Sequence, residues 1–241
     1  MNKTAVITGA SGAIGSETAL ALAKEGYQLL LCGHSSKEKL EETRDRCLRH
    51  TSTCLTICGD MGDSRTAKNI ADTALRQFGR IDVLINNAGV SRIGLVTDVT
   101  DDEWFHMLNT NLSSAFFLCR QILPAMIHEK AGRILNISSI WGSVGASCEA
   151  AYSASKGGLN AFTKALAKEL APSGIAVNAI ACGMIDTKMN ASLTPEEIAS
   201  ICLEIPIGRM ASPEETAEFI ALVLKAPVYM TGQIIGFDGG W

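Results

Sequence analysis

The sequence lacks the features that mark membrane, nucleic-acid-binding and metal proteins. No apolar run among its 241 residues approaches the ~20 residues that cross a bilayer. A net charge of −4 and an isoelectric point near 5.6 give no electrostatic case for binding nucleic acid. The four histidines show no metal-ligand spacing. We therefore expect no membrane span, no nucleic-acid partner and no metal site.

Cysteine is present but forms no pattern. The eight cysteines are scattered, mostly in apolar segments, and contain no C-x-x-C pair. Free buried thiols of this kind are typical of a reducing compartment. The first apolar segment begins at Lys3, which leaves no room for a signal peptide. Both observations predict a cytoplasmic protein.

Short apolar segments alternate with helical patterns along the whole chain. The alternation predicts an α/β fold of the Rossmann type, a doubly wound, seven-stranded parallel sheet with helices on both faces. The length suits a single domain over residues 1–241. The expected strands are Lys3–Thr8, Gln28–Cys32, Cys54–Cys58, Val83–Ile85, Arg133–Ser138, Ile175–Ile180 and Gln233–Phe237.

Parallel strands joined by right-handed crossovers place their carboxyl ends at one edge of the sheet, where a ligand site forms. Residues 184–206 interrupt the alternation and hold one short helix, so we expect a mobile substrate lid there. Helix starts are marked by three capping boxes. They pair Thr100 with Glu103, Thr194 with Glu197, and Ser212 with Glu215.

Tyr152 and Lys156 stand four residues apart in A-A-Y-S-A-S-K-G-G, and Ser139 lies thirteen residues before the tyrosine. In a helix this spacing puts the phenol and the ammonium on one face. A free tyrosine has a pKa near ~10, and a fixed cation beside it favours the phenolate. Lowering that pKa by about three units takes roughly 4 kcal/mol. A tuned tyrosine can act as general acid in carbonyl reduction, or as base in the reverse direction.

Two further motifs follow strands. Gly9, Gly12 and Gly15 lie in T-G-A-S-G-A-I-G, between the first strand and an amphipathic helix. Glycines allow a tight turn and a close approach to a pyrophosphate, which the free N–H groups of the helix start can bind. The segment Asn86-Asn87-Ala88-Gly89 follows the fourth strand. Its amides can tie neighbouring strand ends together, and Ala-Gly leaves room for a ligand.

These motifs, in this order, resemble the short-chain dehydrogenase/reductase family over Lys3 to Trp241. The resemblance implies a catalytic tetrad of Asn111, Ser139, Tyr152 and Lys156, with Asn111 preferred to the nearby Asn109. It implies that Ser139 and Tyr152 act on the carbonyl oxygen, that Lys156 also holds the cofactor ribose, and that Asn111 supports a proton-relaying water. The implied cofactor-binding residues are Gly9, Ser11, Gly12, Ile14, Gly15, His34, Asp60, Met61, Asn87, Ala88, Gly89, Tyr152, Lys156, Gly183, Ile185 and Thr187.

One position departs from the family pattern. Cys182 stands where the family has proline, in V-N-A-I-A-C-G-M-I-D-T. The change removes a φ constraint and adds a backbone N–H and a thiol. The loop beside the nicotinamide is therefore held less rigidly by its sequence, although Gly183, Ile185 and Thr187 still match.

The end of the second strand indicates which dinucleotide is used. An acidic residue there would bind the adenosine 2′-hydroxyl and repel a 2′-phosphate. The sequence has Cys32-Gly33-His34-Ser35-Ser36-Lys37 instead, with no acid. We expect NADPH to be preferred, with NADH possible. Gly12 argues the other way, because many NADPH-binding members have arginine at that position.

The substrate is the least determined property. Long stretches resemble 3-oxoacyl-acyl carrier protein reductases, so a 3-oxoacyl thioester on its carrier protein is the first candidate. The region Trp141 to Glu149 resembles a smaller branch, the reductases of 5-aminopentanone on modified elongation factor P. Glu149 could pair with the amine of that substrate. An acidic carrier protein instead needs a basic patch, for which Arg92, Lys130 and Arg133 are candidates.

The intact tetrad and the family resemblance also bear on catalysis and on oligomeric state. A protein of this fold can also bind dinucleotide without catalysis, but the intact tetrad disfavours that alternative. The family resemblance implies a homotetramer. Its interfaces would use the helices at Asp101–Glu129 and Tyr152–Ala171, and the last strand with the helix at Ser212–Leu224.

Overall fold

A seven-stranded parallel sheet forms the centre of the computed structural model, which describes residues 3–191 and 193–241. The strands run in the order β3-β2-β1-β4-β5-β6-β7. Every expected strand is present, with ends that differ by no more than two residues from the prediction. The strands are β1 Thr4–Thr8, β2 Gln28–Gly33, β3 Cys54–Cys58, β4 Val83–Asn86, β5 Gly132–Ser139, β6 Ile175–Cys182 and β7 Ile234–Phe237.

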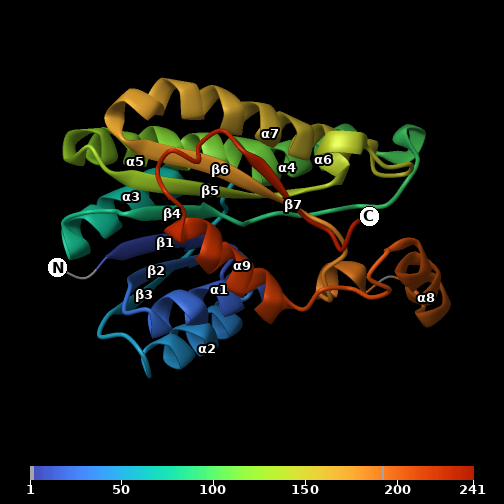
Figure 1. Cartoon of the computed structure of the whole chain (residues 1–241), viewed down its shortest axis with the longest axis horizontal. Helices are drawn as coiled ribbons and strands as arrows, with labels where there is room; N and C mark the ends of the chain where they lie inside the picture. The colour runs from blue at the N-terminus through green and yellow to red at the C-terminus, as the bar shows by residue number, and fades with distance from the viewer. Residues whose placement is uncertain (1–2, 192) are drawn as a thin grey trace.

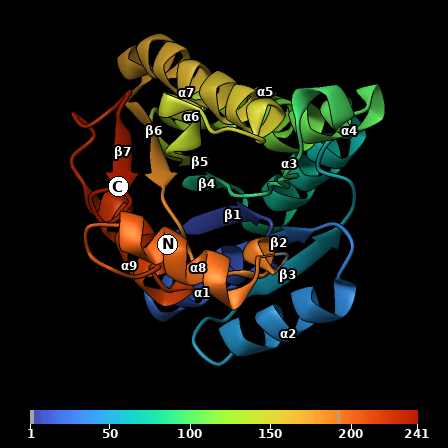
Figure 2. The same ribbon diagram turned by 90° about the vertical axis from the view of Figure 1, so that its right-hand side faces the viewer.

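Helices cover both faces of this sheet (Figure 1). One face carries α1 Ala13–Lys24, α2 Lys37–Cys47 and α9 Pro213–Lys225. The other carries α3 Ser64–Phe78, α4 Asp101–Leu108, α5 Ser114–Glu129 and α7 Ala150–Leu170. The same two layers are visible in the perpendicular view of Figure 2. Two short helices, α6 Trp141–Val144 and α8 Pro195–Glu204, lie at the edge where the strands β5 and β6 end.

The two-layer arrangement follows from the alternation of side chains along the strands. In β2, Leu29 and Leu31 pack into the core beneath α1 and α9, whereas Leu30 packs into the core beneath α3 and α5. All three leucines are fully buried. Strands that are apolar on both sides need a helix on each face, so the continuous apolar segments specify the doubly wound fold.

The helix expected over 101–129 contains a π-helical turn. Helix α4 ends at Leu108, residues Asn109–Ser113 form the π turn, and α5 continues from Ser114. Turns of this kind are rare and often lie at functional sites. Here the turn contains Asn111, which is buried.

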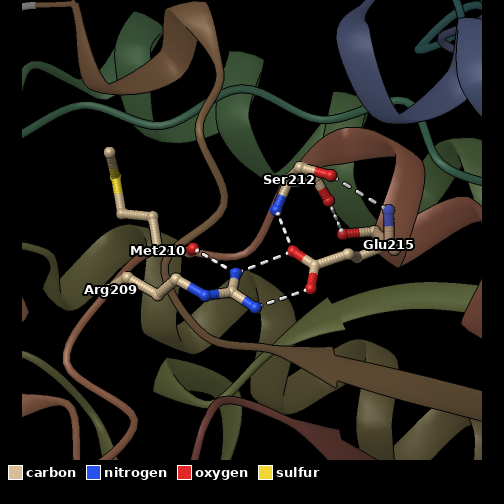
Figure 3. A network of polar contacts seen from close by, with 5 residues as sticks. Arg209, Met210, Ser212 and Glu215 are labelled. Atoms are coloured by element: carbon tan, nitrogen blue, oxygen red, sulfur yellow. Dashed lines mark hydrogen bonds and ion pairs between the residues drawn. The ribbon is translucent and has the colours of Figure 1, made fainter.

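The segment 184–206 is fastened at its base. Ile185 forms a parallel bridge with Ala211, and the backbone N–H of Asp186 donates to the carbonyl of Ala211 at 2.9 Å. The chain then enters α9 through a polar network (Figure 3). Both guanidinium nitrogens of Arg209 donate to Glu215, at 2.7 and 2.8 Å, and lower the pKa of that carboxyl to about 2.

Other expectations of local structure are also confirmed. The three capping boxes form at the starts of α4, α8 and α9. All eight cysteines are free, and five of them are buried. In the described ranges, no helix is both long and apolar enough to cross a membrane.

A buried chain of amides links β4, β5 and α7. The side chain of Asn86 donates to Asn136 at 2.8 Å, and Asn136 donates to the hydroxyl of Thr163, also at 2.8 Å. Asn136 and Thr163 have no exposed surface. Because an unpaired buried polar group is costly, each member depends on the others.

We expect Asn136→Ala to lower the free energy of unfolding by about 2 to 4 kcal/mol, because it removes two buried hydrogen bonds and leaves Asn86 and Thr163 with only their bonds to Cys119 and Leu159. Urea unfolding followed by circular dichroism measures this loss. Asn69→Ala is the matched control, because Asn69 is exposed on α3. Equal stability of the two variants would contradict the role given to the amide chain.

Candidate active site

A cavity of about 800 Å³ lies at the carboxyl edge of the sheet. It is lined by every residue expected to hold the cofactor, from Gly9 after β1 to Thr187 after β6. Ser139 also lines it, whereas Asn111 is buried behind the wall. The structure thus brings together segments that are far apart in the sequence. The functional roles of these residues stay predictions.

The glycine turn opens α1 toward this cavity. Gly9 has a φ of 66°, a left-handed conformation that favours glycine. A Cβ on Gly15 would lie only 2.3 Å from the carbonyl oxygen of Gly9. Gly12 precedes the helix and provides no side-chain cap, so N–H groups of the first turn can bind a phosphate.

The segment after β4 is tied to the end of β1. The hydroxyl of Thr8 accepts from the backbone N–H groups of Asn87 and Ala88, at 2.9 and 3.0 Å. In return, the amide of Asn87 donates to the carbonyl oxygens of Thr8 and Gly9, at 3.0 and 3.2 Å. The expectation that asparagine amides join strand ends is confirmed here.

Tyr152 and Lys156 project from the same face of α7. Both are nearly buried, with 9% and 4% of their surface exposed. The Lys156 Nζ donates to the carbonyl of Ile137 in β5 at 2.8 Å and lies 5.7 Å from the centroid of the Tyr152 ring. The phenol and the ammonium are therefore neighbours, as the spacing predicts.

Burial has the largest effect on the acidity of both groups. It raises the pKa of Tyr152, and a hydrogen bond with Ser139 acts in the opposite direction. Burial also lowers the pKa of Lys156 to about 8. The expectation of a phenol acidified by the ammonium omitted this desolvation, so it overstated the effect of Lys156 in the resting protein.

Asn111 is fixed by three hydrogen bonds. Its side-chain oxygen accepts from the backbone N–H of Val90 at 2.8 Å, and its amide donates to the Val90 carbonyl at 2.9 Å and to Ser155 at 3.0 Å. A Cβ placed on Gly89 would lie 3.4 Å from both the Asn111 oxygen and the Lys156 Nζ. Asn111 and Lys156 therefore both lie beside Gly89.

Cys182 is held by the sheet despite the missing proline. It ends β6, paired with Ser139 on one side and Phe237 on the other. Its carbonyl accepts from the N–H of Ile140 at 3.0 Å. The buried thiol lines the cavity, and burial raises its pKa to about 12 while the charge of Lys156 opposes that rise. The strand pairing on both sides thus holds the backbone at this position without a proline.

Sequence reasoning missed Trp241 as a site residue. It follows the last strand in D-G-G-W and lines the same cavity as Tyr152. The two glycines before it were the available signal, because they indicate a tight turn there. Nothing in the sequence places that turn beside α6.

Comparison with known proteins supports one family throughout. The short chain dehydrogenase family profile matches residues 3–198. An uncharacterized oxidoreductase of Bacillus subtilis, YmfI, is 42% identical, covering all of this chain and 99% of that protein. The 3-oxoacyl-[acyl-carrier-protein] reductase FabG of Staphylococcus aureus is 36% identical, covering all of this chain and 98% of its own.

A solved structure extends the likeness to three dimensions. A variant of the actinorhodin polyketide ketoreductase, crystallised with NADPH, matches with a TM-score of 0.93 and 33% identity, covering 99% of this chain and 97% of its own. The sequence motifs, the sheet order and these full-length matches agree, and the chain belongs to the short-chain dehydrogenase/reductase family.

Proposed function

We propose that this oxidoreductase is an NADPH-dependent carbonyl reductase in which Tyr152 delivers the proton. One observation carries the proposal: the glycine turn, Ser139, Tyr152 and Lys156 border a single cavity. A dinucleotide bound along the turn would reach the two hydroxyl groups at the other end. A non-catalytic binding protein would not need this convergence.

The residues divide the chemistry between them. NADPH, when bound, supplies hydride to the carbonyl carbon. As negative charge grows on the carbonyl oxygen, the Ser139 hydroxyl donates a hydrogen bond to it. Tyr152 retains its proton at neutral pH, because burial raises its pKa, and gives that proton to the oxygen. The nearby Lys156 ammonium stabilises the phenolate left behind.

Asn111 and Lys156 have supporting roles in this proposal. Lys156 holds the ribose hydroxyls of the cofactor, and Asn111 supports a water that returns protons toward Lys156. Both groups lie beside Gly89, which supports this arrangement. The hydrogen bonds of Asn111 to Val90 also position the segment that forms the cavity wall.

The charges near His34 support NADPH. His34 and Ser35 line the cavity without an acidic neighbour at the end of β2. Lys188 of the proposed lid also lines it, and the adjacent side chain of Lys39 in α2 lowers the pKa of Lys188. Two neighbouring ammonium groups favour an anion between them. The 2′-phosphate of NADPH is such an anion.

The two candidate substrates are a 3-oxoacyl thioester on its carrier protein and the 5-aminopentanone group on modified elongation factor P. Reduction of a 3-oxoacyl thioester is supported by the full-length likeness to a 3-oxoacyl-[acyl-carrier-protein] reductase. The expected basic patch is dispersed, however. Lys130 and Arg133 lie at the amino edge of the sheet, where β5 begins, opposite the cavity. Arg92 lies at the cavity but forms an ion pair with Glu103.

The segments that border the substrate side are acidic instead. Residues 91–106, 140–149 and 184–206 contribute to the cavity or to its neighbour of about 290 Å³. They include Arg92 and Lys188 as their basic residues, against nine acidic ones. The acidic residues are Asp98, Asp101, Asp102, Glu103, Glu149, Asp186, Glu196, Glu197 and Glu204. Of these, Glu149 and Asp101 line the cavities, and Glu103 is paired with Arg92. The remaining excess of acidic residues in these segments disfavours an acidic carrier protein and favours a cation.

Glu149 gives a specific reason to favour an amino ketone. It lines both cavities, and its carboxylate accepts a hydrogen bond from Ser91 at 2.7 Å. Burial of the phenol has the largest effect on the pKa of Tyr152. The charge of Glu149 raises that pKa by a smaller amount, so Glu149 lies near the reacting group. We infer that the geometry favours the 5-aminopentanone group on modified elongation factor P over the thioester.

The proposed lid, 184–206, and the homotetramer belong to the same proposal. The lid carries Lys188 and borders the cavity through Leu193 and Ile201. Exposed apolar side chains on α4 and α5, among them Phe105 and Phe116, are consistent with an interface there.

Tyr152→Phe should reduce kcat for carbonyl reduction by about 10²- to 10⁴-fold, because the proton donor is lost. NADPH affinity should stay within about threefold, because the variant keeps the aromatic ring and all the other expected cofactor-binding residues. Stopped-flow reduction and fluorescence titration measure the two quantities. Tyr27→Phe, which removes another buried phenol hydroxyl, is the control. Unchanged turnover in Tyr152→Phe would refute the catalytic assignment.

The wild-type protein should use NADPH at least about tenfold better than NADH in kcat/KM, and His34→Asp should remove or reverse that preference. The new carboxylate repels the 2′-phosphate and can bind the 2′-hydroxyl. His50→Asp makes the same charge change at an exposed residue outside the cavity lining and should have no effect. A wild-type preference for NADH would sink the cofactor assignment.

Glu149→Gln should raise KM for aminopentanone-modified elongation factor P by about tenfold or more, since a charge pair worth roughly 1.4 kcal/mol is lost. The KM for acetoacetyl-acyl carrier protein should stay the same or fall. Glu169→Gln, at an exposed site near the other end of α7, is the matched control. Faster wild-type turnover of the thioester than of the amino ketone would reverse the ranking of the two substrates.

A further inference from the structure

Two tryptophans from distant parts of the chain meet at the substrate side of the cavity. Trp141 begins α6, two residues after Ser139, and Trp241 follows β7. Their ring centroids are 4.9 Å apart with an interplanar angle of 69°, an edge-to-face pair. Both indoles line the cavity that contains Tyr152, and both are partly exposed. In Figure 1 the end of the chain lies between α6 and α8.

The turn that carries Trp241 is built into the fold. Gly239 and Gly240 have φ angles of 69° and 89°, which other residues rarely adopt. The Gly239 carbonyl accepts from the N–H of Ile207 at 3.2 Å, and a Cβ on Gly239 would lie 2.7 Å from the Ile207 side chain. The N–H of Gly240 donates to Asp238 at 2.9 Å. The indole therefore has a defined position.

The same turn contacts the loop on the cofactor side. The N–H of Gly183 donates to the carbonyl of Phe237 at 2.9 Å, and a Cβ on Gly183 would lie 2.8 Å from the Asp238 Cα. The turn is thus fastened both to Gly183 and to Ile207, just beyond the proposed lid. Its backbone contacts do not need the indole, which is free to serve a ligand.

We propose that Trp241, together with Trp141, forms the wall against which the alkyl chain beside the substrate carbonyl packs. Trp241 is then a specificity-determining residue. The inference rests on the proposed carbonyl reductase function. An alkyl chain flanks the carbonyl in both candidate substrates, so the aromatic wall serves either of them. Apolar contact with indole faces contributes binding energy for each methylene group that it covers.

A chain-length series tests this directly. For wild-type protein with NADPH and 2-alkanones from butanone to octanone, KM should fall by about two- to fourfold with each added methylene group. Trp241→Ala should flatten this dependence and raise KM for octanone at least tenfold, with kcat within about threefold. Trp241→Phe should restore part of the dependence, because it retains an aromatic face.

Controls separate this role from a structural one. Tyr229→Ala removes an exposed aromatic side chain and should leave the series unchanged. NADPH affinity and the melting temperature should be the same in Trp241→Ala and wild type. An unchanged chain-length series in Trp241→Ala would overturn the inference, as would a loss of NADPH affinity equal to the rise in KM. If the wild type reduces no ketone, thioester or amino ketone, the proposed function itself fails.

Discussion

The hydrogen bonds between Thr8 and the segment after β4 hold the two halves of the site together. The Thr8 hydroxyl accepts two backbone N–H groups, and the Asn87 amide returns two bonds to the glycine turn. One side of this junction is the glycine turn, where a Cβ on Gly15 would clash with the carbonyl of Gly9. The other side is Gly89, beside which Asn111 and Lys156 lie. The same contacts therefore fix the proposed phosphate-binding turn relative to the proposed catalytic residues.

Burial has the largest effect on the pKa of Tyr152 in the structure, whereas the sequence spacing suggests control by the neighbouring ammonium. In the resting protein, burial disfavours the charged forms of both groups, so it raises the pKa of the phenol and lowers that of the Lys156 ammonium. A proton donor for reduction needs to keep its proton until negative charge grows on the substrate oxygen, so a raised pKa suits that direction. In the proposed mechanism the ammonium would matter most in the transition state, when the phenolate forms beside it in surroundings of low polarity. Lys156, whose pKa is about 8, remains mostly protonated near neutral pH and can supply that charge.

Much of the fold could be predicted because each strand is a short apolar run with helices on both sides, and a parallel sheet then brings the strand ends together. The cofactor-binding residues follow those strand ends, which is why their convergence was predictable. The π turn around Asn111 was not, since its sequence continues an ordinary helical pattern. The position of Trp241 depends on how a glycine turn packs against Ile207, a contact between segments that local sequence does not record. Lys130 and Arg133 lie far from the cavity because β5 begins beside them and runs toward it. Their spacing along the chain does not reveal this.

In the proposed reaction, selectivity for the carbonyl compound has to come from outside the tetrad. Ser139 and Tyr152 would act on a carbonyl oxygen, which a thioester substrate and an amino ketone share, so these residues would not distinguish the two. The cavity linings add other groups: Glu149 lines both cavities, and Asp101 lines the smaller one. At physiological ionic strength charges act over about 8 Å, which is enough to reach a bound substrate but not a distant partner surface. In the proposed function, Glu149 would therefore select on the small molecule itself, and acidic residues farther out would act only on a carrier protein that comes within that range.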